Sequence, residues 1–312
     1  MINYQKVYHK FSKKQQAILG LILANIIWGA ASPIFKWSLT NIAPFTLAYL
    51  RFLIASLIFL IFYKKFLPIE KKDWIKVVLI GITGVFLNIT FFFFGLKTSS
   101  AINAPIIATA GPIFILTGAV LFLKEHPRPR LILGLIIALI GVISIVIQPI
   151  LVKGTDASFG GNLLFVLATL AAAVHTLFAK EPLKKYGAQT ITFWTFFVGS
   201  VSFFPFAFWE WQANPDWLLQ IDIRGASGIL FGAFLSSALA YFLWHRGLEV
   251  LGASETQVFV YLDPVVAILL AWFLIGETPT SIYIFGSVLV FLGIWVAERR
   301  IAYHPIHKLK KV

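Results

Sequence analysis

Long apolar runs separated by short polar segments follow one another along the whole chain. Each run is roughly twenty residues long, which is the length of a helix that crosses the hydrocarbon core of a bilayer. The pattern predicts ten membrane-spanning helices, at about 16–35, 45–63, 75–95, 100–123, 131–150, 160–178, 190–209, 225–245, 253–275 and 281–298. We therefore expect an all-α integral membrane protein with almost no soluble part.

The distribution of basic residues predicts how these spans are oriented. Ten spans place both termini on one side of the membrane, and Lys and Arg accumulate on the cytoplasmic side. If the termini are cytoplasmic, only four of the 26 basic residues fall in outside segments. These four are Lys36, Lys97, Lys153 and Arg224, while Arg51 and Lys76 lie within spans. We expect a multi-pass protein of the cytoplasmic (inner) membrane with both termini in the cytoplasm.

Composition agrees with this picture and excludes several classes of protein. Only 12% of the residues are charged, against about 25% in soluble domains. The net charge of +13 follows from the basic inner segments, and no basic domain of the kind that binds nucleic acid is present. The absence of cysteine excludes disulfides, thiolate catalysis and zinc–sulfur sites.

The second half of the sequence repeats the first. The window 95–143 matches 247–295 at an offset of 152 residues, and the matches include prolines, glycines and a glutamate that mark special backbone positions. They are Gly95/Gly247, Leu96/Leu248, Ala101/Ala253, Pro112/Pro264, Ala119/Ala271, Glu125/Glu277, Pro127/Pro279, Ile132/Ile284, Gly134/Gly286 and Gly141/Gly293. The first two spans match spans 6 and 7 at an offset of 144, so eight extra residues are expected in the loop 209–224.

Each copy of the repeat contains five spans, and this odd number determines their relation. The second copy enters the membrane from the opposite side, so the two five-helix repeats must be inverted, an arrangement typical of transporters. We expect a cytoplasmic tail at 1–15, repeats at 16–150 and 158–298, and a basic cytoplasmic tail at 299–312.

Several short motifs resemble the EamA-type branch of the drug/metabolite transporter superfamily. They are Trp28-Gly29, Arg51-Phe52, Tyr261-Leu262-Asp263-Pro264, Ile275-Gly276-Glu277, Gly286 and Gly293. The resemblance covers about residues 16–298. It implies an exporter of amino acids and other small metabolites, with a central cavity lined by spans 1, 3, 4, 6, 8 and 9.

Two of these motifs depart from internal symmetry. Ala172-Ala173 stands in the second repeat where the first has Trp28-Gly29, and Gly111 stands opposite Asp263. A cavity between the repeats would therefore be chemically asymmetric.

Charged residues inside the spans are costly in lipid and are the first functional candidates. Asp263 precedes Pro264 in span 9, and its carboxylate either binds a cationic group or carries a proton. The alternative is an ion pair, or a role in satisfying backbone groups that Pro264 frees. Arg51 in span 2 suits a substrate carboxylate; the alternatives are a structural ion pair and snorkelling toward the surface.

Two polar stripes and one histidine complete the candidate substrate site. They are Asn25, Trp28 and Ser32 in span 1, Ser237, Tyr241 and Trp244 in span 8, and His175 in span 6. The stripes either line a cavity or hold helices together. Trp244 and the neighbouring His245 suit an interfacial belt equally well, and a hydrogen-bonded structural role is the simpler explanation for His175.

These features predict a secondary transporter, and not an enzyme. We expect export of amino acids or other small polar metabolites by alternating access, with proton coupling left open. A nucleotide-sugar-like carrier and a lipid-handling flippase or scaffold are the alternatives. The sequence contains no phosphate-binding loop, metalloprotease motif or nucleophile–base pair, and no cofactor or metal is expected. The expected partners are a small-molecule substrate and the lipid bilayer; protein partners are left open, with a monomer as one option.

Overall fold

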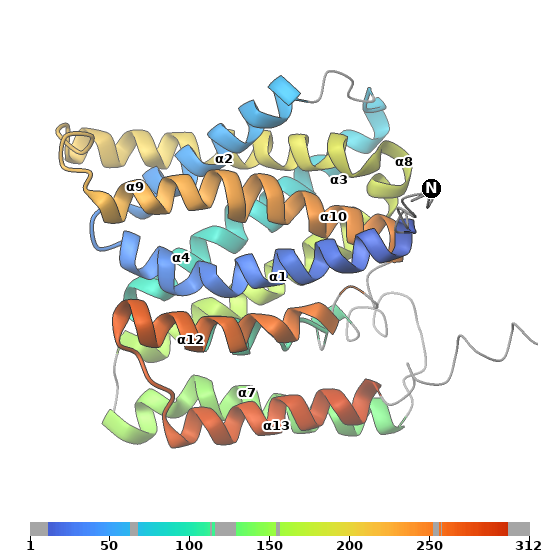
Figure 1. Cartoon of the computed structure of the whole chain (residues 1–312), viewed down its shortest axis with the longest axis vertical. Coiled ribbons are helices and arrows are strands. Elements are labelled where there is room, and N and C mark those ends of the chain that lie inside the picture. Colours follow the sequence, from blue (N-terminus) through green and yellow to red (C-terminus); the bar gives the residue numbers. More distant parts are fainter. Residues whose placement is uncertain are drawn as a thin grey trace, which may run out of the picture.

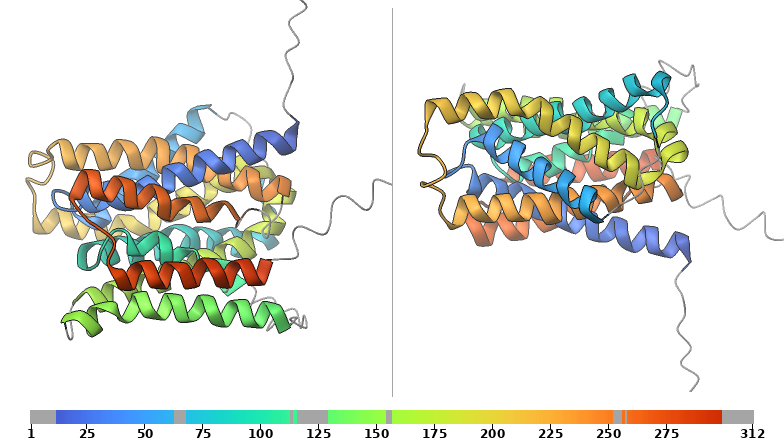
Figure 2. Two further views of the ribbon diagram at one scale, coloured as in Figure 1. Left: turned by 60° about the horizontal axis from the view of Figure 1, so that its bottom comes forward. Right: turned by 90° about the horizontal axis from the view of Figure 1, so that it is seen from above.

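The computed structural model describes residues 12–62, 68–112, 114–115, 129–153, 157–251, 256 and 258–298. Every regular element within these ranges is helical. Figures 1 and 2 show long helices running roughly side by side, with α7 and α13 paired at one edge of the bundle. Most of the predicted tails, 1–15 and 299–312, lies outside the described residues.

The helices follow the apolar runs of the sequence. Their bounds are α1 Lys13–Ser38, α2 Pro44–Phe62, η1 Lys71–Asp73, α3 Trp74–Gly81, η2 Ile82–Leu87, α4 Asn88–Thr98, α5 Asn103–Ala108, α7 Pro129–Lys153, α8 Ala157–Ala213, α9 Ile223–Leu230, η3 Phe231–Leu239, α10 Ala240–Leu251, η4 Val258–Leu262, α12 Asp263–Ile275 and α13 Ser281–Glu298. The elements η2 and η3 are π-helices that continue their neighbours without a break.

Within the described part, six helical segments are long and apolar enough to cross a membrane, and two shorter apolar helices, Phe259–Ile275 and Ser281–Gly293, accompany them. This agrees with the predicted helical membrane protein. Most of the second half of predicted span 100–123 and the first residues of span 253–275 lie outside the described residues. The ten-helix inverted repeat therefore stays a prediction.

The longest element, α8, covers two of the predicted spans. Gly187 in its middle has non-helical angles of φ 76° and ψ 160°, which glycine adopts without the steric cost of a Cβ. His175 before this point and Thr192 after it both contact His245 of α10. In a continuous helix these two residues would be about 25 Å apart, so the chain folds back at Gly187.

Glycines bring α7 and α13 into direct backbone contact. A Cβ placed on Gly286 would lie 2.8 Å from the carbonyl oxygen of Gly141, and a Cβ on Gly293 would lie 2.5 Å from that of Gly134. Because small residues let helix backbones approach closely in lipid, these positions explain why the two helices pair. Gly141 meets Gly286 while Gly134 meets Gly293, so the helices run antiparallel.

Polar contacts hold η1 against the turn of α8. Lys185 Nζ lies 2.8 Å from Asp73 Oδ2 and 2.6 Å from Glu70 Oε1. The hydroxyl of Tyr186 donates to Asp73 Oδ2 at 2.6 Å. The hydrogen bonds from Lys185 and then from Tyr186 lower the pKa of Asp73 below its ordinary value.

This lowered pKa predicts a loss of stability in acid. A carboxyl whose pKa is lower in the folded state stabilises the fold above its ordinary pKa of about 3.9, and the contribution disappears as the pH falls through the lowered value. We expect the unfolding temperature of wild type to fall more steeply below about pH 4 than that of Lys185→Met. Parallel curves for the two proteins would contradict the role given to Lys185.

Candidate functional site

A cavity of about 210 Å³ lies between helices from both halves of the chain. Residues of α1, α2, η2, α4, α5, α8, η3, α10, η4 and α12 line it. Seven of the predicted site residues are among them: Trp28, Ser32, Arg51, His175, Tyr241, Trp244 and Asp263. The structure therefore brings together side chains that lie up to 235 positions apart in the sequence.

Asn25 and Ser237, the two other predicted site residues, do not line the cavity. Asn25 is fully buried, and its Nδ2 donates to the carbonyl oxygen of Leu21 at 2.7 Å. Ser237 accepts a hydrogen bond from Arg51, while the neighbouring Ser236 lines the cavity. The sequence pattern missed Ser236 because η3 is π-helical, and its wider turns shift which residues share a face.

Three aromatic rings form one wall of the cavity. The ring of Trp28 lies 5.2 Å from the rings of both Tyr241 and Trp244. Trp28 Nε1 donates to the carbonyl oxygen of Ser236 at 3.0 Å, and the Tyr241 hydroxyl donates to that of Gly84 at 3.0 Å. Both acceptors belong to the π-helices η3 and η2, a type of turn that is frequent at functional sites. These hydrogen bonds fix the polar atoms of Trp28 and Tyr241.

Arg51 is buried and held by neutral groups. Its Nε donates to Ser237 Oγ at 3.0 Å, and its Nη2 donates to Ser236 Oγ at 3.1 Å. The guanidinium lies 4.6 Å from the ring centres of Phe35 and Phe52. Within the described residues no carboxylate pairs with it, and Nη1 has no hydrogen-bond partner. Arg51 therefore neither snorkels nor takes part in an ion pair there.

Asp263 begins α12, and its side chain is 7% exposed. Its Oδ1 is buried and has no hydrogen-bond partner in the described part of the chain. On α1, a Cβ added to Gly29 would lie 2.7 Å from the backbone oxygen of Asp263. The Trp28-Gly29 motif therefore has two roles: the tryptophan supplies an aromatic wall, and the glycine lets α1 approach the start of α12.

His175 and His245 form a pair that the sequence did not predict. Both rings are buried, and their Nε2 atoms are 3.2 Å apart. Burial contradicts the interfacial position considered for His245. No local pattern indicated the contact, since the two residues are separated by 70 positions.

At the C-terminal end of α1, polar links join the two halves of the chain. Lys36 Nζ lies 2.6 Å from Glu277 Oε1 and also donates to the carbonyl oxygen of Ser99 at 2.6 Å. Glu277 Oε2 accepts from Ser100 Oγ at 2.6 Å and from the amide of Ala101 at 2.8 Å. Lys36 and Glu277 are 241 positions apart, so no local pattern in the sequence indicated this ion pair.

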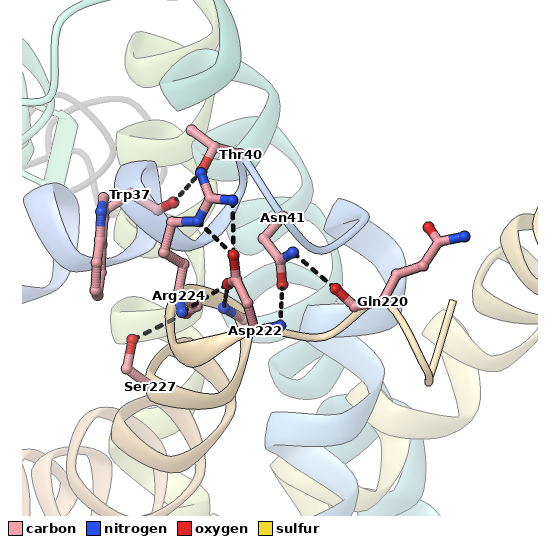
Figure 3. A network of polar contacts seen from close by, with 8 residues as sticks. Trp37, Thr40, Asn41, Gln220, Asp222, Arg224 and Ser227 are labelled. Atoms are coloured by element: carbon pink, nitrogen blue, oxygen red, sulfur yellow. Dashed lines mark hydrogen bonds and ion pairs between the residues drawn. The ribbon is translucent and has the colours of Figure 1, made fainter. Parts of the chain in front are cut away.

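A second network lies at the same end and is shown in Figure 3. Asn41 Nδ2 donates to the carbonyl oxygen of Gln220 at 3.0 Å, and its Oδ1 accepts from the amide of Asp222 at 3.1 Å. Arg224 pairs with Asp222 at 2.6 Å and donates to Thr40 Oγ1 at 3.2 Å. The turn between α1 and α2 is therefore tied to the loop before α9.

Known proteins resemble this chain in sequence and in fold. The chain is 32% identical to an uncharacterized transporter of Archaeoglobus fulgidus over 90% of this chain and 98% of that protein. It is 30% identical to the uncharacterized transporter YyaM of Bacillus subtilis, over 88% and 90%. A solved structure titled only "Crystal structure of protein" matches with a TM-score of 0.64 at 17% identity, over 96% of this chain and 99% of that one, which shows a shared fold. The EamA-like transporter family matches residues 15–147 and 159–298, so this chain is a member of the EamA-like transporter family.

Proposed function

We propose that this transporter exports amino acids, or other small polar metabolites that carry both charges, by alternating access driven by a proton gradient. The observation that carries the proposal is that Arg51 and Asp263 line one cavity and that each has a buried polar atom without a partner. A buried charge is expensive unless it is paired. A substrate that brings both a carboxylate and an ammonium group would satisfy both residues at once.

The free atoms define how such a substrate binds. Two guanidinium nitrogens of Arg51 are engaged by serines, so Nη1 is left to donate to the substrate carboxylate. Asp263 Oδ1 accepts from the ammonium group. The aromatic wall of Trp28, Tyr241 and Trp244 offers an apolar and cation-attracting surface for the remainder of the molecule.

The size of the cavity favours a small substrate. Pockets for drug-sized ligands measure roughly 300–1,000 Å³, and the volume here is about 210 Å³. A nucleotide sugar is larger and carries phosphates, which several basic residues would have to bind, whereas Arg51 is the only Lys or Arg that lines the cavity within the described residues. A lipid-handling protein would need its polar lining to open toward the bilayer.

Two observations support inverted five-helix repeats at 16–150 and 158–298. The family matches the chain twice, over 15–147 and 159–298. In addition, Gly134 and Gly286 are repeat counterparts, as are Gly141 and Gly293, and the contacts exchange them: Gly141 meets Gly286 and Gly134 meets Gly293. Such an exchange is expected of two copies related by a two-fold axis. Rocking of the copies about the cavity would provide alternating access.

If both termini are cytoplasmic, the end closed by Lys36 and Glu277 faces outward. Replacing Glu277 by glutamine removes the ion pair and is expected to open that end more often. The chain contains no cysteine, so a single Ala104→Cys in the cavity lining can be labelled without background. We expect an impermeant maleimide added outside to react several-fold faster in the Glu277→Gln background.

Glu249→Gln is the matched control, because Glu249 pairs with Arg246 on α10, and its side chain is 28% exposed compared with 20% for Glu277. The control should leave the labelling rate unchanged. Equal rates in wild type and Glu277→Gln would show that the ion pair does not hold this end closed.

The proposed substrate class is tested with purified protein in liposomes. Liposomes loaded with unlabelled amino acids should take up radiolabelled amino acids by exchange, and a pH gradient should drive net accumulation. The proposal fails if no amino acid exchanges while a nucleotide sugar exchanges or a fluorescent phospholipid crosses the membrane.

A further inference from the structure

We propose that the facing Nε2 atoms of His175 and His245 bind one shared proton, and that this proton couples transport to the gradient. The coupling role rests on the transport function proposed above, whereas proton binding can be measured without any substrate. The proposal follows from the hydrogen-bond partners of the two rings.

The histidine pair belongs to a series of four consecutive polar contacts. His175 Nδ1 lies 3.1 Å from the carbonyl oxygen of Ile80, and the two Nε2 atoms lie 3.2 Å apart. His245 Nδ1 lies 2.6 Å from Thr192 Oγ1. That hydroxyl also lies 2.6 Å from the carbonyl oxygen of Ala188. Both ends of this series of contacts are therefore backbone oxygens, which only accept hydrogen bonds.

Counting protons along the four contacts shows that, with both histidines neutral, one proton is missing. Each of the four contacts needs one proton to be a hydrogen bond. Two neutral imidazoles and one threonine hydroxyl supply three protons. Whichever tautomers are chosen, at least one contact then has two lone pairs facing each other. One proton taken from a hydronium ion, which leaves as water, completes all four contacts, and no electron is transferred.

In the part of the protein that the structure describes, the histidine pair has no charged group in direct contact. Within the described residues, no carboxylate and no Lys or Arg contacts either ring. Three ionisable groups lie on the same or neighbouring elements. The ring of Tyr241 on α10 is 6.1 Å from that of His245, and Arg51 of α2 and Asp263 of α12 line the same cavity as His175. The charge of the bound proton is stabilised by the carbonyl oxygens of Ile80 and Ala188 at the two ends of the series of contacts.

The position of His175 links this proton to the substrate. His175 lines the cavity, whereas His245 lies behind it and is fully buried. Gly84 of η2 lies so close to the His175 ring that a Cβ there would overlap it, so the ring is held in place. A proton on the pair and an ammonium group in the cavity repel each other. The protein therefore binds either the proton or the substrate at one time. Exchange of substrate for protons across the membrane requires this alternation.

The proton count itself can be tested by histidine NMR. The chain has six histidines, and replacing His9, His126, His304 and His307 by glutamine leaves only the pair. Histidine labelled with ¹⁵N should show both rings changing together in one step, with uptake of one proton per molecule. His175→Gln and His245→Gln should each abolish that step. Two independent steps, or no step before the protein unfolds, would overturn the proposal.

Replacing Thr192 provides a sharper test, because it changes the proton count without changing either histidine. Proton uptake by a purely structural pair would not depend on that count. Thr192→Val removes two contacts and one proton, so the two contacts that remain are satisfied by the two neutral rings. We expect this variant to lose the one-proton uptake at the pH at which wild type shows it, whereas Thr192→Ser retains it. Uptake that is unchanged in Thr192→Val would contradict the count.

Transport assays then separate the two proposals. His245→Gln, whose ring does not line the cavity, should still exchange radiolabelled amino acids across liposomes but should lose accumulation driven by a pH gradient. Gradient-driven accumulation retained in this variant would exclude the coupling role. If wild type exchanges no amino acid, the proposed function fails, and the NMR result still decides whether the pair binds the proton.

Discussion

Replacing Arg51 by methionine is expected to reduce amino-acid exchange by about ten- to a hundred-fold. Arg51 is a buried cation that lines the cavity, and its Nη1 is free to donate to the substrate carboxylate. A hydrogen bond to a charged group contributes about 1.5–3 kcal/mol, and each 1.4 kcal/mol changes affinity tenfold. Exchange measured in liposomes at several substrate concentrations should show the loss chiefly as weaker binding.

Arg51→Lys should recover little of this loss. Lysine keeps the charge but lacks the planar fork with which Arg51 contacts Ser236 and Ser237 while still presenting Nη1. The methionine side chain suits the phenylalanines around the site, so the bundle should remain folded. Arg224→Gln is the matched control, because that arginine is 40% exposed and pairs with Asp222 away from the cavity. Normal exchange by Arg51→Met would refute the assignment of the substrate carboxylate.

Asp263→Asn is expected to have an effect of similar size on exchange. Asparagine preserves the shape of the side chain at the start of α12 but removes the negative charge that would pair with the substrate ammonium group. Because exchange at equal pH requires no proton movement, its loss would indicate a role in binding. Asp216→Asn, in the exposed loop before α9, should behave as wild type.

The same variant distinguishes the two roles that the sequence left open for Asp263. If Asp263→Asn exchanged amino acids normally but lost pH-driven accumulation, the carboxylate would carry the proton and the histidine pair would not be needed for coupling. If both activities were unchanged, Asp263 would be structural. The expected result is loss of both, since a substrate that does not bind cannot be driven.

Much of the candidate site could be predicted because polar residues are rare in the apolar runs. Arg51, Asp263, Trp28 and Ser32 were identified in this way and line the cavity, whereas Asn25, the third residue of the predicted span 1 stripe, does not. Ser237 was one residue away from Ser236, because the π-helix η3 shifts the register. The contact between His175 and His245 could not be predicted, since each histidine taken alone has an ordinary explanation at its own position.

The sequence by itself determined that this is a helical membrane protein with an internal repeat. A segment in lipid must satisfy its own backbone and expose apolar side chains over about twenty residues, and both requirements are visible locally. Only the tertiary structure decided which polar groups meet. Lys36 and Glu277 are 241 positions apart, Arg51 and Ser237 are 186 apart, and His245 joins residues on both sides of the Gly187 turn. Such contacts depend on how the helices pack and on where π-helical turns rotate their faces, which no local pattern encodes.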